Sequence, residues 1–344
     1  MSMKKCSKML KSHEMSSFLF LVVLILMVGC INPGFLQSTS ILNCFNDSVV
    51  FTLLAVGSTF VILTGEIDVS VGATLGISAA VGATMLRKGS NWAAAIFAAL
   101  MIGAVVGMIN GFGVSFLNIP SLIFTLGVNG VVRGMIYVYT KGAWVENLPS
   151  AYTKLSNITL FGDLTIFYAV TLIVVIGIHL VLTKTRKGRY FIAVGDNAAG
   201  AAMVGIPAVK TKIVAYVLCG VFAAIAGMIY TSRIGFITPT AGNGYEMKAI
   251  AACVLGGISL AGGQGSVIGA AIGAVLMASI GRILVFLGFS SDYDSTITGI
   301  LLITMVVINT VTQNRAIKNN RHQILLHRTS EEPHSVDQEG GMQQ

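Results

Sequence analysis

The chain has 344 residues, of which 54% are hydrophobic and only 10% are charged. Soluble domains carry about 25% charged residues, so a chain this apolar could not cover its own surface with polar groups in water. Membrane β-barrels show short alternating segments, which are absent here. The long apolar runs separated by short polar breaks therefore predict a bundle of membrane-spanning helices.

The net charge of +8 comes from basic residues placed beside the apolar runs. Lysines precede the first run, a basic cluster occupies 184–189, and further basic residues follow 313. This distribution is typical of cytoplasmic segments of membrane proteins and argues against nucleic-acid binding. The basic start and first apolar run resemble a secretory signal, but no small-x-small cleavage site follows. We interpret 16–31 as a retained first helix.

The apolar runs predict an all-α polytopic membrane protein with about ten transmembrane helices. In chain order the runs are 16–31, 47–64, 70–86, 93–117, 120–140, 164–183, 212–232, 246–262, 264–288 and 296–313. If 1–15 is cytoplasmic, six crossings return the chain to the basic loop 184–212, and four more place 314–344 inside. The transmembrane domain is thus 16–313, followed by a cytoplasmic tail that we expect to be disordered because it carries basic and then acidic blocks.

Several runs are short for a hydrocarbon core of about 30 Å, which needs about 20 helical residues. We expect broken or half-membrane helices around 65–69 and 262–265. Related sequences, Leu-Gly-Ile-Ser at 75–78 and Leu-Gly-Gly-Ile-Ser at 255–259, lie on helices predicted to run in opposite directions. This pattern is consistent with an inverted repeat of five plus five helices, or with chance recurrence of small residues.

Glycines recur at spacings of three or four, for example at Gly103, Gly107 and Gly111. Small residues on one face let helices approach closely in lipid, so we assign most of them to packing. A role in lining a pathway is left for glycines beside the polar breaks, such as Gly256 and Gly257.

No catalytic or metal-binding pattern occurs in the sequence. There is no G-x-S-x-G elbow, no H-E-x-x-H pair, no metal-spaced cysteine cluster and no phosphate-binding G-x-x-x-x-G-K-[ST] loop. We expect no enzymatic activity, metal site or cofactor in this chain. Any use of ATP would require a separate protein.

Polar residues within apolar sequence are the candidates for a solute pathway, because a charge at mid-helix in lipid costs at least about 2.5 kcal/mol. These candidates are Asp68, Asn110, Thr125, Glu246, Gly256, Gly257 and Ser259. Asp68, predicted near the cytoplasmic side, could instead cap a helix before Val69, and Glu246 could cap one on the outer side. Asn110 could bond across helices. Arg133 and Arg282 lie close enough to helix ends to reach the interface.

The loop 184–212 is the longest predicted cytoplasmic connection. Asp196 or Asn197 can cap a short helix of small residues that ends at Gly205. Such a helix could dock into a groove of a partner protein, or it could be an ordinary interfacial connector.

These residues resemble the permease subunits of the ribose-type branch of bacterial ABC sugar importers, over about 45–313. The resemblance rests on five stretches: Leu63–Gly72, Asn110-Gly111, Ile119–Gly127, Gly188–Ile206 and Glu246–Gly273. Within this family the chain resembles most the autoinducer-2 import permeases, through Trp144–Pro149, Gly195–Asn197 and Ile234–Ile237. Glu66 departs from the family pattern, which more often has a small residue there.

The resemblance implies an inner-membrane importer of autoinducer-2 that works by alternating access. Two homologous permeases would form a heterodimer, ATPase subunits would dock below, and a periplasmic binding protein would deliver the ligand. The residues that it assigns to ATPase coupling are Gly195, Asp196, Asn197, Ala201, Ala202 and Gly205. The low charge of the pathway suits a small uncharged polyol or sugar. Ribose or another monosaccharide, an ion-coupled transporter and a structural or signalling role remain alternatives.

Overall fold

The computed structural model describes residues 13–290, 292–304, 306–307 and 311. Most of the predicted cytoplasmic N-terminus and the whole predicted tail, 314–344, lie outside the described residues. Residues up to Ile300 belong to one compact unit, and a second unit begins at Leu301. Residues 293–300 at the end of the first unit are helical, and so are residues 301–304 of the second.

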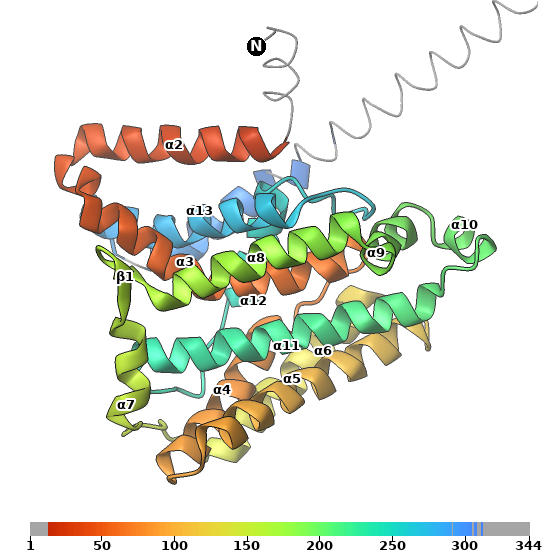
Figure 1. Cartoon of the computed structure of the whole chain (residues 1–344), viewed down its shortest axis with the longest axis horizontal. Coiled ribbons are helices and arrows are strands. Elements are labelled where there is room, and N and C mark those ends of the chain that lie inside the picture. Colours follow the sequence, from red (N-terminus) through yellow and green to blue (C-terminus); the bar gives the residue numbers. More distant parts are fainter. Residues whose placement is uncertain (1–12, 291, 305, 308–310, 312–344) are drawn as a thin grey trace, which may run out of the picture. The chain divides into compact units, whose positions relative to one another are not determined.

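Helices make up most of the described chain (Figure 1). The first half contains α2 (His13–Ile31), η1 (Pro33–Leu36), α3 (Ser38–Leu63), α4 (Val71–Arg87), α5 (Trp92–Ser115) and α6 (Ser121–Thr140). The second half contains α7 (Ser150–Thr153), η2 (Lys154–Asn157), α8 (Ile166–Lys184), α9 (Arg186–Asp196), α10 (Ala198–Met203), α11 (Ala208–Ile234), α12 (Tyr245–Leu255) and α13 (Val267–Phe286). One small antiparallel hairpin, β1 (Thr159–Phe161) with β2 (Leu164–Thr165), precedes α8.

Six helices of the described chain are long and apolar enough to cross a membrane: α3, α5, α6, α8, α11 and α13. The apolar helices α2 and α4 are shorter by the same measure. The prediction of a mainly helical, multi-pass membrane protein is therefore confirmed, whereas the count of ten helices and the five-plus-five repeat stay predictions. The helix predicted over 246–262 is wrong in extent, because α12 ends at Leu255 and Gly257 adopts a left-handed φ of 84°.

Helix α11 lies at the centre of the unit, packed against α3, α4 and α5 (Figure 1). The glycine stripe of α5 allows the closest of these approaches. A Cβ on Gly103 would lie 2.2 Å from the carbonyl oxygen of Gly220, and one on Gly107 would lie 2.3 Å from that of Tyr216. The prediction that these spaced glycines serve helix packing is confirmed.

Short polar side chains fix where several helices begin. The side-chain oxygens of Asn91, Thr185, Asn197 and Ser266 each accept a hydrogen bond from a backbone N–H in the first turn of α5, α9, α10 and α13. These bonds satisfy donors that have no partner within the helix. The local sequence therefore sets these four boundaries.

The helices differ in how much apolar surface they expose. Helix α3 is buried almost throughout, whereas α6 and α8 leave most of their apolar residues uncovered. A soluble protein could not tolerate such faces, but lipid or a membrane partner covers them without cost.

Candidate functional site

The α3–α4 connection passes through the protein interior, and Asp68 organises it. Asp68 is 4% exposed, and its Oδ1 accepts hydrogen bonds from the backbone N–H of Ser70 at 2.8 Å and from its hydroxyl at 2.7 Å. Asn110 of α5 donates to the Ser70 hydroxyl at 2.7 Å and to Asp68 Oδ1 at 3.4 Å. The structure thus brings the predicted residues Asp68 and Asn110 together.

The expected start of the following helix differs from the observed one. We expected Asp68 to cap a helix before Val69, but α4 begins at Val71 with Ser70 at the cap position. Asp68 lies two residues earlier and closes a turn on the N–H of Ser70. Its second oxygen faces Asn110, so interhelical contact rather than capping fixes its position.

Two further helices hold the same connection. Thr125 of α6 accepts a hydrogen bond from the N–H of Val69 at 3.1 Å. Lys212 of α11 pairs with Glu66 at 2.5 Å. Side chains of α6 and α11 therefore supply partners to backbone groups of this non-helical stretch, as backbone at membrane depth requires.

The second break lies before α12, and Glu246 and Arg133 meet there. Arg133 of α6 donates to the carbonyl oxygens of Ala241 at 2.6 Å and Gly242 at 2.7 Å. Glu246 Oε1 accepts from the N–H of Gly244 at 3.2 Å, and Oε2 lies 3.8 Å from the Arg133 guanidinium. Arg133 therefore donates to backbone carbonyl groups at the break before α12, an arrangement that the sequence analysis did not predict.

The two breaks meet, although the sequence places Asp68 and Glu246 toward opposite sides of the membrane. A Cβ on Gly72, in the first turn of α4, would lie 2.2 Å from Glu246 Oε2 and 2.4 Å from the carbonyl oxygen of Gly242. The starts of α4 and α12 are therefore in contact. Interrupted helices that begin at a common point inside the membrane are typical of transport proteins.

The remaining pathway candidates, Gly256, Gly257 and Ser259, lie in the chain directly after α12. Gly256 packs against α13, where its Cβ would lie 2.3 Å from the carbonyl oxygen of Gly269. Gly257 supplies the left-handed residue that ends α12. The backbone N–H of Ser259 donates to the carbonyl oxygen of Gln264 at 3.0 Å, which folds 259–264 into a tight loop. These contacts are those of packing and turn residues.

The predicted coupling segment is attached to the end of α3 and to the loop that follows α12. A Cβ on Gly195 would lie 1.8 Å from the carbonyl oxygen of Leu63, the last residue of α3. That same oxygen accepts the N–H of Gly263 at 3.0 Å, and a Cβ on Gly263 would lie 2.9 Å from the backbone of Asp196. Helix α9 thus touches the end of α3 and the loop after α12 at one place.

Helix α10 forms most of the rest of the predicted coupling segment. Asn197 caps it by accepting the N–H of Gly200 at 2.8 Å, and Gly205 ends it with a φ of 81°, as the sequence predicts. Ala201 is buried against the body, whereas Ala202 is exposed. Next to them, Met203 and Val204 are 89% and 77% exposed. The sequence analysis missed these two residues, which their size could have indicated, because they are the only large apolar side chains among the small residues of 198–205.

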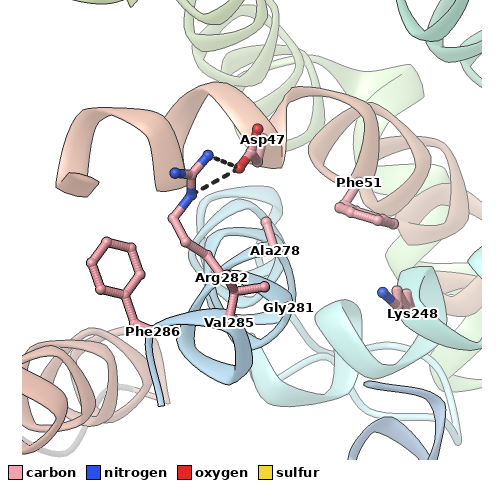
Figure 2. A pocket seen from close by; sticks show the side chains of 8 residues that line it. All are labelled: Asp47, Phe51, Lys248, Ala278, Gly281, Arg282, Val285 and Phe286. Carbon is pink, nitrogen blue, oxygen red and sulfur yellow. Dashed lines mark hydrogen bonds and ion pairs between the residues drawn. The ribbon is translucent and has the colours of Figure 1, made fainter. Parts of the chain in front are cut away.

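A charged cavity that the sequence analysis also missed lies between α3, α11 and α13. Asp47 Oδ2 accepts hydrogen bonds from Arg282 Nε at 3.0 Å and Nη2 at 2.5 Å, and its Oδ1 accepts one from Arg233 at 2.7 Å. Figure 2 shows Arg282 turned toward Asp47, with Phe51 and Lys248 together on the other side. Arg282 thus binds a carboxylate instead of reaching the interface, which the sequence could not show because its partner lies 235 residues away.

Comparisons with known proteins match most of the chain. Residues 40–306 match the family described as "Branched-chain amino acid transport system / permease component". The match includes both breaks, which are the α3–α4 connection and the stretch before α12. It also includes the coupling segment and the charged cavity. No solved structure matches the chain.

Several relatives are similar along most of their length. The chain is 39% identical over 321 residues to the autoinducer 2 import system permease protein LsrC of Enterobacter sp. (strain 638), covering 92% of this chain and 93% of the relative. It is 40% identical over 298 residues to the protein of the same name from Salmonella choleraesuis (strain SC-B67), covering 87% and 86%. The corresponding Yersinia pestis (strain Pestoides F) protein is 39% identical over 298 residues, covering 87% and 85%.

Proposed function

We infer that this chain, which belongs to the family of branched-chain amino acid transport system permease components, is the membrane permease of an ATP-driven importer of autoinducer-2. The assignment of the substrate rests on 39% identity over 92% of the chain to a relative named as an autoinducer 2 import permease. The chain supplies the transmembrane passage, and a separate subunit supplies ATP hydrolysis.

Helices α9 and α10 are the proposed contact with that ATPase. Met203 and Val204 form a small apolar projection whose burial in a groove would be favourable. Gly195, at the other end of the segment, is in direct backbone contact with α3 and with the loop after α12. A displacement of the projection would therefore act on the end of α3, where the α3–α4 connection begins, and on the loop after α12, which is the kind of coupling that alternating access requires.

The remaining features of the proposal concern the assembly. A second, homologous permease covers part of the exposed apolar face of α5, α6 and α8, and lipid covers the rest. A periplasmic binding protein delivers the solute from the outer side. Both termini are cytoplasmic in an inner-membrane topology of about ten helices, including the five-plus-five repeat.

The decisive experiment measures uptake of autoinducer-2 and of ribose by cells that lack only this gene, with and without the restored gene. We expect restoration to return autoinducer-2 uptake, and removal of the ATPase subunit to abolish it. Return of ribose uptake instead would make the substrate assignment wrong. Uptake that persists without the ATPase would overturn the ATP-driven mechanism in favour of an ion-coupled one.

The docking of α10 has its own test in the Met203→Ser variant. Loss of a buried methionine side chain costs about 1.5–3 kcal/mol, so we expect retention of the ATPase on the purified permease to weaken by about tenfold or more. Leu160→Ser, which changes an exposed apolar residue of β1 on the predicted outer side, is the matched control. Equal ATPase retention by the two variants would contradict the assignment of α10.

A further inference from the structure

The charged cavity beside Asp47 consists of two adjoining pockets, called its chambers below, which share a wall and are open to the surface of the chain. The larger, of about 430 Å³, is lined by Lys248 and Arg282 among others, and the smaller, of about 240 Å³, by Arg233 and Tyr245. Asp47 and Phe51 line both chambers. The larger volume falls within the range of about 300–1,000 Å³ for small-molecule sites.

The polar groups of the cavity face open space although they are paired. The Asp47 side chain is 34% exposed, and those of its partners Arg233 and Arg282 are 24% and 27% exposed. Lys248 pairs with Asp294. The three cations Arg233, Arg282 and Lys248 therefore meet two carboxylates, those of Asp47 and Asp294, which leaves one positive charge in excess. Several guanidinium N–H groups of the two arginines are not bonded to Asp47.

The opposite wall is aromatic. The ring centroids of Phe51 and Tyr245 are 4.8 Å apart, and those of Tyr245 and Tyr230 are 6.1 Å apart. Lys248 Nζ lies 5.0 Å from the Phe51 centroid. A wall of ring carbons beside fixed donors and acceptors suits a small molecule with hydroxyl groups on an apolar carbon frame.

We propose that this two-chambered cavity is the site on the outer side where the permease receives its hydroxyl-rich solute. Asp47 accepts hydrogen bonds from solute hydroxyl groups, and the guanidinium groups of Arg233 and Arg282 donate to solute oxygens. The rings of Phe51 and Tyr245 contact the carbon frame. Tyr245 is the first residue of α12, so the smaller chamber lies next to the place where α4 and α12 meet.

The proposal rests on the proposed function for the solute class, and the positions of the groups support it independently. The residues come from α3, α11, α12 and α13, and their predicted topology places the cavity in the outer half of the membrane. A charge cluster at such depth is costly unless it is paired or serves a function. Ion pairs that served only to join helices would be expected in a closed contact, whereas the pairs of Asp47 border open volume.

The test uses a cysteine at Gly281, which lines the larger chamber and where an added Cβ would meet no atom within 4 Å. The exposed Cys30 is first replaced by serine. Membranes containing the permease with its ATPase, but without the binding protein, are treated from the outer side with a membrane-impermeant thiol reagent. The labelling rate is measured with and without millimolar autoinducer-2 and, separately, ribose. Ser150→Cys, exposed at the start of α7, is the control position.

We expect autoinducer-2 to slow labelling of Gly281→Cys at least threefold and to leave Ser150→Cys unchanged. Adding Asp47→Asn should remove this protection and lower uptake about tenfold or more. Asp163→Asn, the same chemical change at an exposed aspartate that does not line the cavity, should alter neither. Unchanged labelling by every solute that the complex transports would overturn the cavity assignment.

The same measurement separates this inference from the proposed function. If ribose alone is transported and ribose alone protects Gly281→Cys, the substrate assignment is wrong while the cavity assignment stands. If autoinducer-2 is transported without protecting the cysteine, the function stands and the cavity is only an ion-paired contact between helices. Protection that survives Asp47→Asn would also contradict the role given to Asp47.

Discussion

Two aspartates, Asp68 and Asp47, both lie in a mainly apolar protein and have opposite surroundings. Asp68 is 4% exposed and is held by neutral donors, the Ser70 N–H and hydroxyl and the Asn110 amide. The Asp47 side chain is 34% exposed, borders open volume and is held by two guanidinium groups.

This difference separates a structural carboxylate from one available to a solute. The bonds of Asp68 join the α3–α4 connection to itself, to α5 and, through Cys219, to α11, so its removal leaves donors without acceptors in a dry interior. Asp47 joins three helices through groups that water or a solute hydroxyl can also satisfy. Stability should therefore depend mainly on Asp68, and solute recognition mainly on Asp47.

The largest expected effect on stability is that of Asp68→Ala. It leaves the N–H and hydroxyl donors of Ser70 without their acceptor, at about 1–3 kcal/mol for each buried group left unsatisfied, whereas the Asn110 amide keeps its bond to the Ser70 hydroxyl. We expect the free energy of unfolding in detergent to fall by about 3 kcal/mol, whereas Asp68→Asn, which keeps an acceptor oxygen, should lose less. Equal stability of Asp68→Ala and the parent would remove Asp68 as the organiser of the break.

Next in size is Gly195→Ala, which tests the contact of α9 with α3. The added Cβ would lie 1.8 Å from a backbone oxygen that cannot rotate away, and such overpacking costs about 1–3 kcal/mol. The matched control is Gly177→Ala in α8, where a Cβ meets nothing within 4 Å and helix propensity favours alanine by up to about 1 kcal/mol. Melting temperatures of the two variants should move in opposite directions, and a shared direction would contradict the close contact.

The ion pair between Glu66 and Lys212 should contribute about 1 kcal/mol or less. The two side chains are 17% and 22% exposed, so solvent screens part of their attraction. A double-mutant cycle with Glu66→Gln and Lys212→Met measures the coupling through unfolding in detergent. A coupling near zero would show that the α3–α4 connection is held by its uncharged bonds alone.

The smallest expected effect on stability is that of Asp47→Asn. Its partly exposed ion pairs are worth about 1 kcal/mol or less, so the melting temperature should stay close to that of Asp163→Asn. Solute protection and uptake should nevertheless be lost. A stability loss as large as that of Asp68→Ala would place both aspartates in the same structural class and remove the contrast.

The sequence alone determined the class of the protein and much of its local structure. Hydrophobic runs and flanking charges predict a multi-pass helical protein, because lipid requires every backbone group to be bonded within a helix. Asn197 and Gly205 predict the limits of α10, and the spacing of Gly103 and Gly107 predicts a packing face, since caps and small-residue stripes act over a few residues. The family resemblance points to the permease role.

Only the tertiary structure decided which distant residues meet. It placed Gly72 beside Glu246 although their breaks were predicted toward opposite sides, and it joined Asp47 to Arg233 and Arg282. No local pattern encodes such contacts, because a charge in an apolar run looks the same whether its partner is solvent, backbone or another helix. Burial and partner identity, which separate the role of Asp68 from that of Asp47, arise only when the helices pack.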